Sequence, residues 1–210
     1  MTVHAGDAVS GTPIPAWITP AFFLSGFAAL IYQVVWQRVL FAAFGISIEA
    51  VTVVVTAFLV GLGIGSIVGG QLSRLRSRPV LLWFGSIELT IAAYGLCSVP
   101  LFRAVGSGSS GMRPLTTGVI TFGLVLLPTL LMGATLPLLV SYAVRVSGNV
   151  GRSVGWLYFI NTAGSSVAAI AAALIIMGRF GEMRTVWWAV AVNATVGTFV
   201  LSRHWRAPVA

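Results

Sequence analysis

The stretch AFLVGLGIGSIVGGQLSRLRSRP, residues 57–79, contains the pattern around which the rest of the chain is organised. Small residues recur at every fourth position, at Ala57, Gly61, Gly65, Gly69 and Ser73. At about 3.6 residues per turn, this spacing places them along one face of a helix. In a membrane, such a face lets two helix backbones approach closely. We therefore predict that this stripe packs against another helix and binds no ligand.

The same stretch ends in a cluster of arginines followed by a proline. Arg74, Arg76 and Arg78 fall within five residues, directly before Pro79. Short loops rich in arginine are typical of the cytoplasmic side of a membrane protein. The stretch therefore predicts the orientation of the chain as well as a packing face.

The composition of the whole chain is that of an integral membrane protein. Of its 210 residues, 58% are hydrophobic and 8% are charged, whereas soluble domains carry about 25% charged residues. The net charge of +8 comes from arginines scattered between apolar runs, which fits contacts with lipid headgroups and excludes a nucleic-acid surface. Cys97 is the one cysteine, so neither an intrachain disulfide nor a cysteine metal cluster is expected. We predict no metal, no cofactor and no catalytic residue.

Six apolar segments can be counted along the chain, and each is long enough to cross a bilayer. We expect an all-α bundle of six transmembrane helices over residues 17–203, with a polar lead-in at 1–16 and a short tail at 204–210. The predicted segments are about 17–44, 49–72, 79–103, 115–144, 150–177 and 183–201. Within the fourth segment, two prolines are expected to kink the helix, because each removes a backbone donor. These are Pro128 and Pro137.

Six crossings would place both termini on one side of the membrane. That side would hold Arg74, Arg76, Arg78, Arg145, Arg152, Arg203 and Arg206. The opposite side would hold Arg38, Arg103, Arg113, Arg179 and Arg184. Seven arginines against five predict cytoplasmic termini in a multi-pass protein of the cell (inner) membrane.

Three stretches resemble the membrane domain of membrane-bound spermidine synthase-like proteins, which are polyamine aminopropyltransferases. They are FFLSGFAALIYQVVWQRVL at 22–40, LLPTLLMGATLPLLV at 126–140 and GWLYFINTAGSSVAAI at 155–170. That membrane domain is in turn similar to half of a major-facilitator transporter. The resemblance therefore implies a half-transporter fold of six helices.

Two departures from these patterns bear on function. In GGQLSRLRSRP, 69–79, Ser73 stands where the transporter loop signature has an aspartate, so gating by charge pairing is not implied. The resemblance also implies a catalytic domain after the last membrane helix, but this chain ends at RHWRAPVA, 203–210. We expect the catalytic domain to be absent from this chain, which would then not be an enzyme by itself.

Glu88 is the ionisable group with the strongest claim to a role inside the membrane. It lies near the middle of the 79–103 segment, about 14 Å from its start. A charged side chain at that depth costs at least about 2.5–3.5 kcal/mol, so it should face the bundle interior. With Gln33 and Asn161 it forms our candidate polar site, either for a proton or small cation or as a structural carboxyl hydrogen-bonded to neighbouring helices. Arg38 and Glu49 flank the first connection and are predicted to form a structural ion pair.

Two functions remain open from the sequence. The first is a membrane module that anchors, positions or regulates a protein partner, such as a separately encoded aminopropyltransferase domain or a larger membrane complex. The second is a half-transporter that acts as a homodimer on a small cation such as a polyamine. Both place the chain in a lipid bilayer with a protein partner or a second copy.

Overall fold

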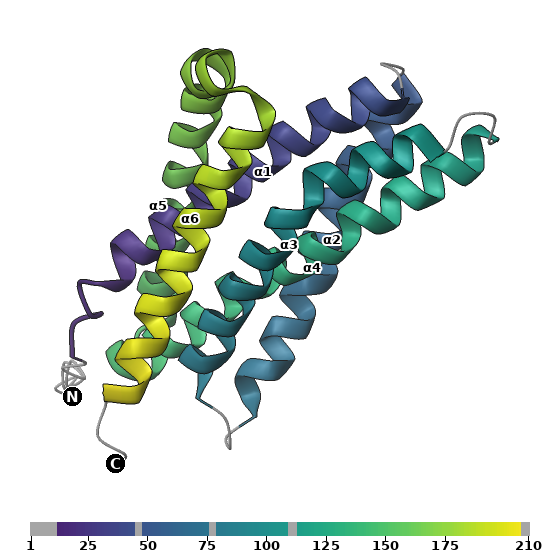
Figure 1. The fold of residues 1–210 in the computed structure, drawn as a ribbon. Coiled ribbons are helices and arrows are strands. Elements are labelled where there is room, and N and C mark those ends of the chain that lie inside the picture. The colour runs from purple at the N-terminus through teal and green to yellow at the C-terminus, as the bar shows by residue number, and fades with distance from the viewer. Residues whose placement is uncertain (1–11, 45–47, 76–78, 109–112, 207–210) are drawn as a thin grey trace, which may run out of the picture.

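The computed structural model describes residues 12–44, 48–75, 79–108 and 113–206, which form a bundle of long helices (Figure 1). In this part of the chain there are six α-helices and one π-helical turn. They are α1 (Ile18–Phe44), α2 (Ile48–Arg74), α3 (Val80–Gly108), α4 (Pro114–Ser147), α5 (Val150–Ala171), η1 (Ala172–Ile176) and α6 (Met177–Arg206).

Five helical stretches of the described chain are long and apolar enough to cross a membrane. They are Ile18–Ala42, Val51–Arg74, Val80–Gly108, Leu115–Ser147 and Val150–Trp205. The fifth stretch contains α5, η1 and α6 as one run of 56 residues. Within that run the backbone leaves helical geometry at Gly181, whose φ of 70° and ψ of 176° are open to glycine but not to a bulky side chain. The predicted boundary between the fifth and sixth segments, 177–183, spans this residue.

The helices alternate between the two ends of the bundle. The start of α1, the end of α2, the turn from α4 to α5 and the end of α6 lie toward one end (Figure 1). Hydrogen bonds join these parts: Arg145 Nη2 donates to the Ser73 carbonyl, and Trp156 Nε1 donates to Thr19 Oγ1. We call this the basic end, because its exposed charges in the described chain are the arginines Arg74, Arg145, Arg152 and Arg203.

Local capping at the basic end explains the tight turn between α4 and α5. Gly148 adopts φ 68° and donates its backbone N–H to the Val144 carbonyl, which ends α4. The next residue, Asn149, accepts a hydrogen bond of 2.9 Å from the backbone N–H of Arg152 and begins α5. A left-handed glycine followed by an asparagine N-cap is a sequence signal for a helix end and a helix start.

The bundle is organised as three closely packed helix pairs, α2 with α4, α3 with α6 and α1 with α5. The small-residue stripe of α2 lies on the face packed against α4. A Cβ atom on Gly65 would overlap the Leu130 carbonyl, and one on Gly69 would lie 2.6 Å from the Ala134 carbonyl oxygen. On the facing helix α4, a Cβ on Gly133 would overlap the backbone of Leu62 on α2. Backbone therefore meets backbone along this seam.

The other two pairs use glycine in the same way. In the α3–α6 pair, a Cβ on Gly197 would lie 2.9 Å from the Gly85 carbonyl oxygen. In the α1–α5 pair, a Cβ on Gly164 would overlap the Phe23 carbonyl, and one on Gly26 would overlap the Asn161 carbonyl. Each close pair thus requires residues without a side chain at its crossing point.

Helix α3 differs in extent from the sequence-based prediction, whereas the kinks at Pro128 and Pro137 stay a prediction. α3 continues to Gly108, five residues beyond the predicted end at Arg103. α4 continues as a helix through Pro128 and Pro137, and the Pro137 ring packs within 2.9 Å of the position that a Cβ on Gly69 would take.

Replacing Gly65 by alanine tests the α2–α4 seam. Gly65→Ala should lower the stability of the purified protein by about 1–3 kcal/mol, because the added methyl group forces the two backbones apart. Gly63, two residues away on the same helix, is exposed and has open space where its Cβ would lie. Gly63→Ala should therefore leave stability unchanged or raise it by up to about 1 kcal/mol, because alanine favours the helix. Thermal unfolding in mild detergent measures both variants, and equal stabilities would contradict the seam.

Candidate functional site

Glu88 is completely buried and is the ninth of the 29 residues of α3. One carboxylate oxygen, Oε1, accepts a hydrogen bond of 2.5 Å from Ser25 Oγ on α1. The other oxygen, Oε2, is buried without a hydrogen-bond partner. Buried carboxyl groups are costly unless paired, so one hydrogen bond leaves this group only partly satisfied.

A cavity of about 120 Å³ lies beside this carboxyl group. Residues from all six α-helices line it, and half of them are polar. The polar lining residues are Ser25, Gln33, Thr135, Asn161, Ser165 and Asn193. Ser25 belongs both to the cavity wall and to the hydrogen bond with Glu88, so it connects the cavity to the carboxyl group.

The structure brings the three residues of the predicted polar site into one region. Gln33 and Asn161 line the cavity directly, and Glu88 lies one hydrogen bond behind its wall. Asn193, which is not part of the predicted site, also lines the cavity. It is 2% exposed, and its Oδ1 has no hydrogen-bond partner. A polar residue midway along an apolar segment was the sequence signal for its position.

The α1–α5 crossing fixes two of the polar side chains. Asn161 Nδ2 donates a hydrogen bond of 3.4 Å to the Phe22 carbonyl, and Ser165 Oγ donates one of 3.0 Å to the Gly26 carbonyl. Both bonds run from α5 to the backbone of α1. These side chains therefore hold two helices together while they line the cavity.

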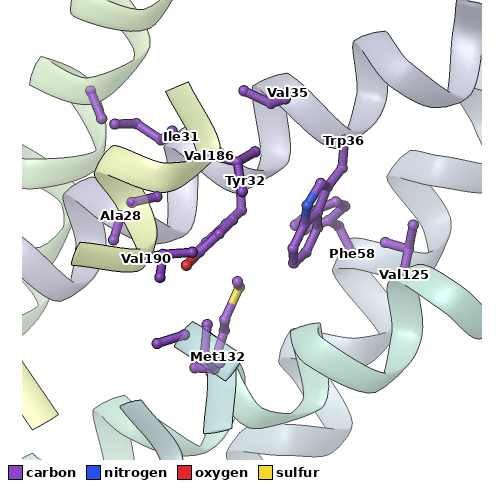
Figure 2. Close-up of a cluster of buried hydrophobic side chains, with 14 of the residues drawn as sticks. Ala28, Ile31, Tyr32, Val35, Trp36, Phe58, Val125, Met132, Val186 and Val190 are labelled. Carbon is purple, nitrogen blue, oxygen red and sulfur yellow. The ribbon is translucent and has the colours of Figure 1, made fainter. Parts of the chain in front are cut away.

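An aromatic cluster packs next to the polar region (Figure 2). Tyr32 and Trp36 project from α1 and stack with ring centroids 4.9 Å apart. Trp36 Nε1 donates a hydrogen bond of 2.9 Å to Ser98 Oγ on α3. The Tyr32 hydroxyl is buried without a hydrogen-bond partner, and Gly95 of α3 leaves the space that its ring occupies. Tyr32 is thus a second unsatisfied polar group in the same interior.

At the end of the bundle opposite the basic end, one acidic residue holds two arginines. Arg38 Nε lies 3.8 Å from Glu182 Oε1, and Arg103 Nη2 lies 2.8 Å from Glu182 Oε2. These contacts tie together the ends of α1 and α3 and the start of α6. The side chain of Glu49, the predicted partner of Arg38, lies outside the part of the chain whose side chains are described. The structure therefore gives Arg38 a partner that the sequence spacing did not identify.

The remaining predicted residues divide between packing and the basic end. Arg74 is exposed, whereas Arg76 and Arg78 lie outside the described residues. Ser73, the last residue of the small stripe, donates its hydroxyl to the Gly70 carbonyl and accepts from Arg145 through its own carbonyl. In the described chain, no three histidine, cysteine, aspartate or glutamate side chains cluster as metal ligands would.

A double-mutant cycle tests which acid pairs with Arg38. Arg38→Gln combined with Glu182→Gln should show a coupling of about 0.2–1 kcal/mol, because both partners are solvent-accessible. The same cycle with Glu49→Gln should show a smaller coupling. Denaturant unfolding of the purified protein supplies the energies, and a larger coupling to Glu49 would restore the pair predicted from the sequence.

Comparison with known proteins gives three relatives, all of them polyamine aminopropyltransferases. The enzyme of Oceanobacillus iheyensis is 24% identical over 173 residues, which are 82% of this chain and 32% of the relative. Polyamine aminopropyltransferase 1 of Streptomyces coelicolor is 26% identical over 182 residues, 86% of this chain and 33% of the relative. Polyamine aminopropyltransferase 2 of the same organism is 25% identical over 181 residues, which are 83% of this chain and 32% of the relative.

The similarity concerns one part of these relatives. No protein-family model matches the chain, and no solved structure matches it significantly. The chain spans about one third of the length of the relatives. Since the aligned residues are most of this chain, they include its apolar helices. The chain is therefore a multi-pass helical membrane module that is distantly homologous to the polyamine aminopropyltransferases.

Proposed function

We propose that this chain anchors an aminopropyltransferase domain to the membrane and positions it at the bilayer surface. The observation that carries the proposal is the unequal coverage of the alignments. They include more than four fifths of this chain but only about one third of each relative. The catalytic domain is either part of the same polypeptide or a separate partner, and the helical module holds it in place.

The basic end supplies a surface for that partner. Arg74, Arg145, Arg152 and Arg203 are exposed there, close to the point where α6 finishes at Arg206 (Figure 1). Arginines next to a membrane favour anionic lipid headgroups and acidic protein surfaces. A domain docked at this end would be in contact with both the arginines and the lipid surface.

The topology that we propose is a six-helix bundle resembling half of a major-facilitator fold. The fifth apolar stretch would extend about 84 Å as one straight helix, since each of its 56 residues rises about 1.5 Å. The hydrocarbon core of a bilayer is only about 30 Å thick. The break at Gly181 supports two crossings in this stretch. The excess of arginine at the basic end favours a cytoplasmic location for that end, at the inner membrane of the cell.

Thiol labelling of whole cells tests this topology. In a Cys97→Ala background, Arg113→Cys should react with a membrane-impermeant maleimide, because it begins α4 at the end opposite the basic end. Leu75→Cys, just after α2, should react only after the cells are permeabilised. Both positions are exposed, so a difference in labelling reports the side of the membrane on which each one lies. The reverse labelling pattern would overturn the orientation.

A second function is supported by the polar cavity. A half-transporter that pairs with another copy would need a polar site between its helices, and the cavity is lined by all six of them. In this alternative the pathway carries a small cation such as a polyamine, and Glu88 supplies the negative charge. A stable pair of identical copies is what distinguishes this function from anchoring.

Gentle solubilisation followed by mass measurement decides between the two functions. If the chain anchors a separate catalytic domain, an aminopropyltransferase polypeptide should remain bound in mild detergent, and charge reversal at the basic end should release it. Arg152→Glu is the test variant, and Arg113→Glu at the opposite end is the matched control. If the catalytic domain is on the same polypeptide, the mass should exceed the 22.0 kDa of the helical module. Recovery of a homodimer of 22.0 kDa chains would favour the half-transporter, and recovery of a 22.0 kDa monomer alone would argue against both.

A further inference from the structure

The charge of Glu88 has no counter-ion among the described side chains. Both ion pairs in the described part of the chain belong to Glu182, which is far from Glu88 along the bundle. Glu88 has one hydrogen bond, from Ser25, and an Oε2 atom without a partner. An ionised carboxylate is costly in a membrane interior without a cation beside it. With the cavity holding only water, the neutral, protonated carboxyl is therefore the favoured form.

The polar groups that line the cavity are those that bind a cation. The cavity wall presents side-chain oxygens from Ser25, Gln33, Thr135, Asn161 and Asn193. Amide, hydroxyl and carboxylate oxygens can replace the hydration shell of a small cation. The Asn193 Oδ1 atom is buried and has no partner, so one ligand position is open without breaking an existing hydrogen bond.

Charged side chains from the neighbouring helices do not reach this depth. On α6, Arg184 and Arg203 are nine and ten residues from Asn193, or about 14–15 Å along the axis. On α5, Arg152 is nine residues from Asn161, and on α4, Arg145 is ten residues from Thr135. On α1, Arg38 is thirteen residues from Ser25 and five from Gln33, but its side chain is exposed and lies 3.8 Å from Glu182. On α2, Arg74 is twelve residues from Leu62, which lines the cavity.

Tyrosines are the other titratable groups near Glu88. The Tyr32 phenol, from α1, is buried, and its hydroxyl has no hydrogen-bond partner. Tyr94, on the same helix as Glu88, donates a hydrogen bond of 2.6 Å to the Leu124 carbonyl of α4. Both are neutral when protonated, so neither supplies a positive charge to the site.

We propose that this cavity binds a small monovalent cation in exchange for the proton of Glu88. When the cation enters, the carboxyl group behind the wall loses its proton to the solution, and its negative charge balances the cation through the hydrogen bond with Ser25. The Asn193 amide oxygen and the hydroxyl and amide oxygens of the wall complete the coordination. The net charge of the cavity stays constant, because one positive charge leaves as another arrives.

Charge and volume set the class of cation. One carboxylate balances a single positive charge, whereas sites for calcium and similar ions usually combine several carboxylates. No cluster of three acidic, histidine or cysteine side chains occurs in the described residues. A volume of about 120 Å³ equals the share of about four water molecules at about 30 Å³ each. An alkali ion with some of its water, or a small primary ammonium ion, meets both limits.

This site goes beyond the anchoring role and does not depend on it. The polar residues of the wall come from α1, α4, α5 and α6, so a cation bound here would link these four helices. Binding to the bundle is expected whether or not a partner domain is docked and whether or not the ion crosses the membrane. Failure of partner co-purification therefore leaves the site intact, and failure of cation binding leaves the anchoring proposal intact.

Proton release on cation addition tests the exchange. Purified protein in mild detergent and weak buffer is titrated with sodium, potassium or methylammonium chloride, with choline chloride as the ionic-strength control. At least one of the three cations should release about one proton per protein in a saturable manner. The apparent affinity should fall as the pH falls, because protons compete for Glu88. Comparing the three salts distinguishes an alkali ion from an ammonium ion.

Glu88→Gln should abolish the proton release. Glu182→Gln is the control: it removes the carboxylate that pairs with Arg38 and Arg103, and it should retain the release. Absence of saturable release with every cation, or an unchanged release in Glu88→Gln, would overturn the proposal.

A second pair of variants tests the site independently, in case Glu88→Gln does not fold. Asn193→Ala removes an open cation ligand and should raise the half-saturating cation concentration by about three- to tenfold, as expected for one lost polar contact. Thr195→Ala, on the exposed side of the same helix, removes a hydroxyl that bonds only the Ala191 carbonyl of its own helix. It should leave the concentration unchanged. Equal effects of the two variants would contradict the role of Asn193 in the site.

Discussion

The structure depends on the close approach of helix backbones at glycine. In lipid, apolar side chains gain little by leaving one hydrocarbon surface for another, so helices associate through packing and polar contacts. Each of the three tight pairs meets this requirement with glycines whose Cβ atoms would strike the backbone of the facing helix, as at Gly65, Gly164 and Gly197. Everything else in the bundle, including the polar cavity, is positioned by these three crossings.

The polar interior is a consequence of how those pairs come together. The α1–α5 crossing places Asn161 and Ser165 against the α1 backbone, and the contact of α1 with α3 brings Ser25 to Glu88. The cavity then lies where all six helices meet. Partly satisfied polar groups in such an interior are a cost to folding, which a bound ligand can offset. The basic end, which we propose as the docking surface, and the cavity occupy different parts of the molecule, so one chain could carry both functions.

Several structural features followed from the sequence pattern because they are local. Four-residue spacing predicted the face of α2 that meets another helix. Membrane depth identified Glu88 as a residue of the interior. By contrast, Gly197 and Gly85 belong to no four-residue repeat of small residues like that of α2, so their close contact could not be predicted from spacing. Likewise, sequence proximity suggested Glu49 as the partner of Arg38, whereas Glu182 lies far away in the chain and next to Arg38 in space.

The sequence by itself determined that the chain is a helical membrane protein, where its long apolar segments lie, and which polar residues would be buried. These properties depend on hydropathy and periodicity, which are carried by neighbouring residues. Only the tertiary structure decided that α2 faces α4, that Ser25 is the hydrogen-bond partner of Glu88, and that Gln33, Asn161 and Asn193 line one cavity. Such contacts join residues up to 160 positions apart, from Gln33 to Asn193, and the crossing of helices, not the spacing of residues, brings them together.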